Sequence, residues 1–99
     1  MFVVTLKFAH NKAQAAQFME GHKAWIRRGL EDGVFLLAGS LQAGAGGAIL
    51  AYNAALAELQ ARVNEDPFVA EGVVSAEIAE ITPSAVDPRL AFLSGQAAQ

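Results

Sequence analysis

The first part of the sequence places a long helix between two short apolar strands, and this order limits the folds that the chain can adopt. Residues 12–32 contain no proline and predict one helix. Its apolar side chains recur at the spacing of a single helix face, with about 3.6 residues per turn. These side chains are Ala15, Phe18, Met19, Trp25, Ile26 and Leu30. The segment before the helix, residues 2–8 (FVVTLKF), is apolar and β-branched and predicts a buried strand.

Two more strands follow the helix and are joined by a glycine-rich loop. Gly33 stands where a left-handed residue commonly closes a helix. Residues 34–41 (VFLLAGSL) predict the second strand and residues 48–52 (AILAY) the third, so the AGAGG segment between them reads as a hairpin loop. A nucleotide-binding glycine loop requires a strand, a glycine turn and then a helix, so this loop indicates no such site.

The second half of the chain adds another helix and a last strand. Asn53 is predicted to cap a helix over residues 54–64, and Asn11 to cap the first helix, because an asparagine oxygen can accept a hydrogen bond from a free backbone N–H. Residues 73–81 (VVSAEIAEI) alternate between apolar and polar side chains, which predicts a half-buried strand.

The resulting order, β-α-β-β-α-β, predicts an α+β fold of the ferredoxin-like type. In this fold a four-stranded antiparallel sheet carries both helices on one face, and its other face is left uncovered. Two such sheets can cover each other in a dimeric α+β barrel type of assembly. The composition favours this homodimer, because 54% apolar and 17% charged residues make the 99-residue chain rich in apolar side chains for a monomer.

Residues 1–83 form the predicted domain, and residues 84–99 form a C-terminal extension that is partly docked or flexible. The extension is partly polar, but it also contains large apolar side chains that suggest some docking against the domain. They are Leu90, Phe92 and Leu93.

Charge and composition exclude several classes of partner. A net charge of −3 with scattered Lys and Arg argues against nucleic acid, since phosphate binding needs a basic face. No apolar run reaches the roughly 18–20 residues that span a bilayer, so no membrane partner is expected. The chain has no cysteine, which excludes disulfides and thiolate catalysis and fits a cytoplasmic protein.

His22 interrupts the apolar face of the first predicted helix. It lies three residues after Met19 and three before Trp25, in the middle of that face. An imidazole there needs a hydrogen-bond partner, because an unpaired buried polar group costs about 1–3 kcal/mol. The partner is either structural or half of a catalytic pair, and the spacing favours neither.

Asp66 is the candidate partner, and it has a competing local role. In the Asp66-Pro67 pair the aspartate is suited to cap a short helical turn whose first residue is the proline, and local sequence favours this role. The alternative is that Asp66 reaches His22, because the two helices lie side by side in this fold. A carboxylate bonded to imidazole fixes its tautomer and supports proton transfer.

The sequence offers weaker candidates for metal ligands, for a nucleophile and for the walls of a pocket. The two histidines, His10 and His22, have no metal-ligand spacing, so no metal and no cofactor are expected. Ser40 lacks a nucleophile-elbow sequence around it and is a candidate hydrogen-bond donor in a pocket rather than a nucleophile. Trp25, Phe35 and Phe68 are candidates for pocket walls, although an aromatic residue at helical spacing is more often simply core.

The cationic side chains of the first helix are expected on its solvated side. They are Lys23, Arg27 and Arg28.

In order and spacing these motifs resemble the YCII-related (YciI-like) family of small dimeric ferredoxin-like proteins. The resemblance runs from residue 2 to about residue 83 and starts with the FVVTLKF strand and a mid-helix histidine, His22. It continues with Ala38-Gly39-Ser40, where the family has an Ala-Gly-Pro-like turn, and with the Asp66-Pro67-Phe68 signature. The VAEGV run that follows is equally typical.

The resemblance implies a dimer and an active-site His–Asp pair, carried here by His22 and Asp66. Beside this pair we expect a small-molecule pocket, with Ser40, Gly39, Phe68 and Trp25 in its wall. The resemblance also implies a lyase- or isomerase-like proton transfer on a small, often aromatic, compound. Many members carry an arginine where this chain has Met19. If that arginine holds an anionic group, a neutral ligand is expected here.

Two alternatives remain open from the sequence. One is a non-catalytic ligand-binding or assembly module in which the His–Asp pair is only structural. The other is a related dimeric α+β barrel that binds haem or oxidises an aromatic compound through its histidine.

Overall fold

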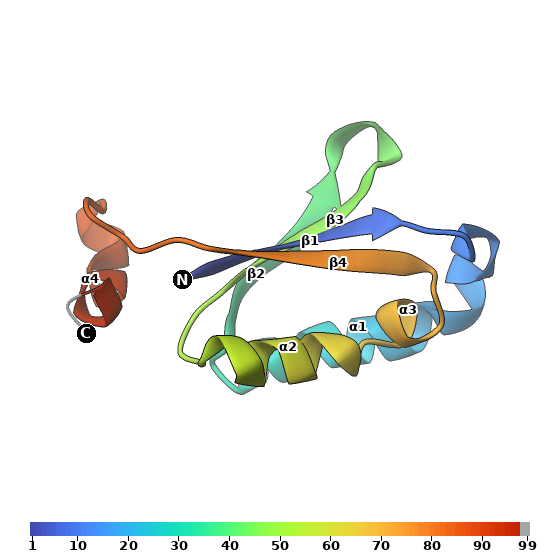
Figure 1. Cartoon of the computed structure of the whole chain (residues 1–99), viewed down its shortest axis with the longest axis horizontal. Helices are drawn as coiled ribbons and strands as arrows, with labels where there is room; N and C mark the ends of the chain where they lie inside the picture. Colours follow the sequence, from blue (N-terminus) through green and yellow to red (C-terminus); the bar gives the residue numbers. More distant parts are fainter. Residues whose placement is uncertain (98–99) are drawn as a thin grey trace.

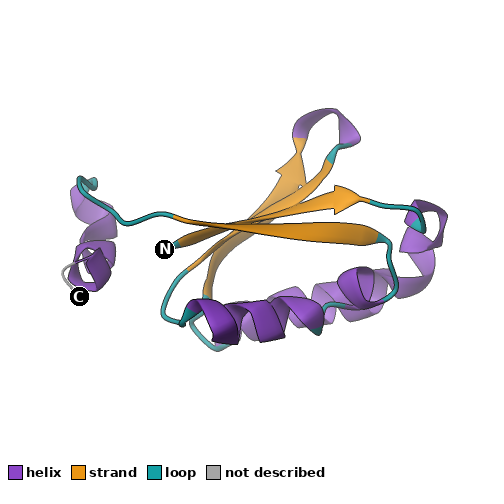
Figure 2. Ribbon diagram, in the orientation of Figure 1, coloured by secondary structure: helices purple, strands orange, loops and turns teal. Residues whose placement is uncertain are grey.

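The computed structural model describes residues 1–97, which form a four-stranded sheet with helices on one of its faces (Figures 1 and 2). The strands are β1 (Phe2–Phe8), β2 (Phe35–Leu41), β3 (Gly46–Ala51) and β4 (Val74–Glu80). The α-helices are α1 (Ala15–Glu31), α2 (Leu56–Asn64), α3 (Pro67–Ala70) and α4 (Ala91–Ala97). Short 3-10 turns are η1 (Lys12–Gln14), η2 (Gln42–Gly44) and η3 (Pro88–Leu90). No helix in this part of the chain is long and apolar enough to cross a membrane.

The sheet has the strand order β2-β3-β1-β4, and every neighbouring pair is antiparallel. The two edge strands are therefore the ones that follow α1 and α3, while β1 and β3 occupy the centre. This topology confirms the predicted ferredoxin-like α+β fold.

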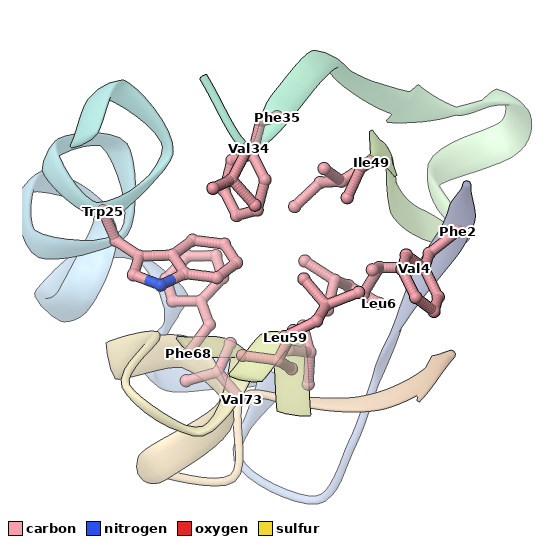
Figure 3. Packing of buried hydrophobic residues seen from close by; sticks show 13 residues of the cluster. Phe2, Val4, Leu6, Trp25, Val34, Phe35, Ile49, Leu59, Phe68 and Val73 are labelled. Carbon is pink, nitrogen blue, oxygen red and sulfur yellow. The ribbon is translucent and has the colours of Figure 1, made fainter. Parts of the chain in front are cut away.

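The core lies between the sheet and the layer formed by α1, α2 and α3. Alternate residues of β1 point into it, and Phe2, Val4 and Leu6 are each no more than 4% exposed. Figure 3 shows the indole of Trp25 reaching from α1 into this cluster, with Phe68 beside it. The Trp25 ring meets that of Phe35 edge-on at 5.0 Å, a favoured geometry for aromatic pairs. The cluster thus fixes α1 against both β2 and α3.

The opposite face of the sheet has no helix over it (Figure 2). One row of apolar side chains crosses all four strands on this face, because Val3 pairs in register with Ala79 on β4 and with Leu50 on β3, and Leu50 pairs with Leu37 on β2. Leu37 is 50% exposed. A continuous apolar row on a solvated sheet face is a feature of surfaces that meet a partner.

The ends of the helices follow local chemistry only in part. Gly33 has φ 74° and closes α1 as predicted. The prediction that Asn11 caps the first helix is wrong, because α1 begins only after η1 and the Asn11 side-chain amide donates instead to the Glu71 carbonyl at 2.7 Å. The Asn53 prediction is also wrong, because this residue takes a left-handed turn with φ 60° and α2 begins at Leu56.

The β2–β3 connection is the short η2 turn, in agreement with a hairpin loop. The strand β3 begins two residues earlier than the sequence predicts, because Gly46 and Gly47 pair with Leu41 and Ser40 of β2. Figure 1 shows the tip of this hairpin projecting away from the helix layer.

The helix α4 lies beyond the end of the sheet that carries the N-terminus (Figure 1). Its contact with the domain includes Phe92, whose ring meets Tyr52 edge-on at 5.2 Å, and Leu93 is 2% exposed. Leu90 and Phe92 remain 43% and 46% exposed, so the extension is only partly packed. The radius of gyration, 14.0 Å, exceeds the roughly 13 Å typical of a compact chain of about 100 residues. The last two residues of the extension lie outside the described residues.

Gly29 is a packing requirement of this fold. A Cβ atom at this buried position would lie 2.1 Å from Cδ2 of Phe35. At an unhindered helix position glycine to alanine gains up to about 1 kcal/mol in helix propensity. Here we expect Gly29→Ala to lower the free energy of unfolding by about 1–3 kcal/mol through overpacking, measured by urea denaturation.

The companion variant combines Gly29→Ala with Phe35→Leu. The smaller leucine side chain should make room for the new Cβ, so Gly29→Ala should lower the free energy of unfolding less in this background than in the wild-type protein. An increase in stability for Gly29→Ala alone would contradict this account of how α1 meets β2.

Candidate functional site

The site forms where α1 and α3 pack closely against each other. Gly21 makes the close packing possible, since a Cβ atom there would lie 3.0 Å from Cγ of Pro67, which is tighter than ordinary contact. The residues that follow Gly21 and precede Pro67 are His22 and Asp66. The close packing at the glycine and the proline therefore brings these two side chains to hydrogen-bonding distance.

His22 and Asp66 form a direct contact, with 2.8 Å between Nδ1 of the imidazole and Oδ1 of the carboxylate. The same Oδ1 atom accepts a hydrogen bond from the backbone N–H of Phe68 at 3.0 Å, which makes Asp66 the N-cap of α3 with Pro67 at its first position. The capping role predicted from the sequence is confirmed. Capping and contact with His22 are not alternatives, because one oxygen serves both.

The second carboxylate oxygen of Asp66 is unusual. The side chain is 0% exposed, and Oδ2 has no hydrogen-bond partner within residues 1–97. A buried acceptor without a partner costs about 1–3 kcal/mol. Capping alone would not require this burial, so the arrangement carries an energetic cost that the helix cap does not explain.

The Asp66 bond determines which nitrogen of His22 is available for chemistry. A carboxylate can only accept hydrogen bonds, so Nδ1 donates and Nε2 of a neutral ring carries the lone pair. Nε2 has no hydrogen-bond partner among the described residues. The ring is held flat on Phe68, with ring centroids 4.1 Å apart and planes 5° from parallel. The imidazole of His22 is thus oriented by Asp66 through Nδ1, while Nε2 is left without a partner among the described residues.

A cavity of about 340 Å³ lies beside His22, between α1 and the sheet. Of the predicted pocket residues, Ser40, Gly39 and Phe68 line it together with His22. The remaining wall is formed by glycine backbone and by small or apolar side chains. The apolar side chains are Leu6, Phe8, Met19, Ile26, Ala38, Ala48, Ile49 and Val74. The chamber is therefore mostly apolar, with few polar groups facing it.

Two aromatic candidates for the pocket wall lie elsewhere than the sequence suggests, and one of them is Phe35, which is buried in the core at 3% exposure. Trp25 does not line this cavity, because its indole is buried in the core at 1% exposure and donates from Nε1 to the Arg62 carbonyl at 2.9 Å. Lys23 is exposed, as expected for the solvated side of the helix, and it also lines this cavity. The available signal was its spacing, since Lys23 lies one helical turn after Met19, on the same face.

The sequence model of the YCII-related domain family matches residues 1–83. The chain belongs to this family. The YCII-related match ends before the η3–α4 extension begins. Among curated protein sequences, none is similar enough to the chain to count as a match.

Among solved structures, this YCII-related chain is similar to 5-chloro-2-hydroxyhydroquinone dehydrochlorinase (TftG) from Burkholderia phenoliruptrix, in complex with 2,5-dihydroxybenzoquinone. The TM-score is 0.66 at 12% sequence identity, and the similarity covers 82% of this chain and 93% of that chain. At 12% sequence identity this similarity shows a shared fold alone.

The double role of Asp66 predicts an ordered series of stabilities in urea denaturation. His22→Leu alone should destabilise the protein by about 3–5 kcal/mol, because it leaves a buried charge unpaired. Adding Asp66→Asn should recover part of this loss, since asparagine still caps α3 and carries no charge. Adding Asp66→Ala instead should leave the protein about 0.5–2 kcal/mol less stable than the Asn double variant, because the cap is lost.

Equal stability of the two double variants would show that Asp66 does not cap α3 to any useful extent. No loss in His22→Leu alone would contradict a stabilising pair.

Proposed function

We propose that this protein is a small-molecule lyase that eliminates a leaving group from an aromatic compound, with His22 as the proton-transfer residue. The observation that carries the proposal is the free Nε2 atom of His22, at the wall of an apolar cavity, in a ring whose other nitrogen is fixed by Asp66. An isomerase-like proton transfer would use the same groups.

The proposed roles follow from this geometry. The bound compound reacts as its keto tautomer, in which a ring proton has moved to the carbon that bears the leaving group. Nε2 accepts a proton from an O–H or C–H group of this tautomer, and the freed electron pair forms a new π bond. The leaving group, such as chloride, departs with the electrons of its bond. Asp66 stabilises the imidazolium that forms, and the proton is then released to solvent. Ser40 and the apolar wall hold the compound in position. General acid–base help of this kind supplies about 10²–10⁴ in rate.

The structural comparison supports this class of reaction. The similar structure is that of a dehydrochlorinase bound to a small quinone, so its fold accommodates elimination on a ring compound. The cavity here has a size in the usual range for small-molecule sites, about 300–1,000 Å³.

A ligand-binding module without catalysis is the second candidate. It is favoured by one observation, the capping of α3 by Asp66, which gives the carboxylate a structural reason to be present. The unpartnered Oδ2 favours catalysis, because functional sites commonly cost stability.

The test uses 5-chloro-2-hydroxyhydroquinone as substrate and measures chloride release. His22→Gln, which keeps a polar side chain of similar length, should lower the rate by about 10²–10⁴ through loss of the proton acceptor. The matched control is His10→Gln at the chain's other histidine, which is exposed and lies outside the cavity. We expect His10→Gln to leave the rate unchanged.

A full rate in His22→Gln would exclude His22 as the base. Tight binding of the compound by the wild-type protein without any chloride release would favour the binding module.

We further propose that the protein is a homodimer in which the two uncovered sheet faces pack together. The apolar row formed by Ala79, Val3, Leu50 and Leu37 supports this assembly, because it lies on the face that no helix covers within residues 1–97. A symmetric pair of such faces is self-complementary, as a two-fold interface requires.

Two exposed leucines provide a matched test of this interface. Leu37 on the sheet is 50% exposed and Leu56 on α2 is 49% exposed. We expect Leu37→Glu to convert the dimer to a 10.4 kDa monomer in sedimentation equilibrium, because it places a charge within the apolar row. Leu56→Glu should leave the dimer intact. A dimer that survives Leu37→Glu and dissociates with Leu56→Glu would place the interface on the helices.

A further inference from the structure

Lys23 adds a cationic residue to the lining of the cavity beside His22. Among the described residues that line this cavity, Lys23 is the only lysine, arginine, aspartate or glutamate. Asp66 does not line it and is sealed behind His22 at 0% exposure. The described lining therefore includes one cationic residue, which is exposed, and no carboxylate residue.

The Lys23 ammonium is also free to bind a ligand. Within residues 1–97 it has no ion-pair partner, whereas Arg62 pairs with Asp32 at 3.0 Å and Arg89 with Asp87 at 2.9 Å. No hydrogen bond from Lys23 to another side chain occurs in this part of the chain. A cation next to a cavity that remains unpaired in the empty protein can pair with an incoming anion without first breaking an internal bond.

A second cation lies close to the same chamber. The Lys12 ammonium lies 4.7 Å from the ring centroid of Phe8, and Phe8 is a 36% exposed wall residue of the cavity. Cations along one side of a low-dielectric cleft raise the local concentration of anions.

The rest of the chamber restricts the body of the ligand. Its wall is apolar apart from His22, Lys23 and Ser40, so an extended polar molecule such as a sugar would leave its hydroxyls unpaired. An engineered apolar cavity of about 150 Å³ holds a benzene ring. The volume here, about 340 Å³, accommodates one ring with its substituents.

We propose that the cavity is specific for small aromatic anions, with a carboxylate or phenolate oxygen bound by Lys23 and the ring against the apolar wall beside His22. This inference rests on the proposed function and narrows its substrate class. It also reverses the expectation of a neutral ligand that follows from Met19, because Lys23 supplies a cation one turn farther along the same helix face.

The experiment compares benzoate with its neutral isostere benzamide, using the backbone amide signals of Phe68 and Ser40 in NMR titrations to report occupancy of the cavity. The wild-type protein should bind benzoate about five- to tenfold more tightly than benzamide, the scale of a charge-assisted bond at a partly solvated site. In Lys23→Gln this preference should disappear, while Lys23→Arg should retain most of it. Added salt should weaken benzoate binding and leave benzamide binding unchanged.

The matched control is Arg27→Gln, which removes a cation from the same helix, one turn beyond Lys23 and outside the cavity wall. It should keep the preference for benzoate. The proposal is overturned if the preference survives in Lys23→Gln, if benzamide binds as tightly as benzoate to the wild-type protein, or if neither compound shifts the Phe68 and Ser40 signals.

Failure of this inference is separable from failure of the proposed reaction. Loss of the charge preference would leave the chloride-release test of His22→Gln unaffected. Conversely, an anion preference that depends on Lys23 in a protein without turnover would describe a binding module with the specificity proposed here.

Discussion

The contact between α1 and α3 is the constraint on which both the fold and the candidate site depend. It is favoured by the absence of a side chain at Gly21, because a Cβ atom there would lie 3.0 Å from Cγ of Pro67, tighter than ordinary contact. It also requires Asp66 at the start of α3, where one oxygen accepts from both Phe68 N–H and His22 Nδ1. The same carboxylate oxygen of Asp66 thus caps α3 and orients the imidazole of His22.

This sharing of one oxygen explains why the two interpretations of Asp66, as a helix cap and as the partner of His22, both hold. Capping preferences concern the residue and the next three positions, and they are satisfied here by Pro67 and Phe68. The bond to His22 crosses 44 positions of the chain and depends on how two helices lie on a sheet. Periodicity and the family resemblance provided this pairing, because they predicted the fold that brings the helices together.

The features that sequence reasoning missed depend on competition between tertiary contacts. Asn53 has the side chain of a helix cap, but it is used in a left-handed turn between β3 and α2. Trp25 and Phe35 are buried in the hydrophobic core rather than in the wall of the cavity, whereas Lys23 lines the cavity and remains exposed. Whether an exposed residue of an amphipathic helix also lines a cavity depends on where the β2–β3 hairpin projects (Figure 1), because Ser40 and Gly47 of these strands line the same cavity as Lys23. Helical periodicity alone contains no information on that projection.

Buried polar and charged groups distinguish the candidate functional site from the rest of the protein interior. Elsewhere the core is built from apolar side chains, and the Trp25 N–H is satisfied by a backbone carbonyl. Asp66 is the single buried charged residue in the described chain, and one of its oxygens is unpaired. A helix cap placed at the surface would have had water for that oxygen. Its burial next to an imidazole with a free Nε2 is costly for folding and useful for proton transfer, because a low-dielectric surrounding strengthens the bond that orients His22. The energetic cost of the site and its proposed chemistry therefore have the same origin.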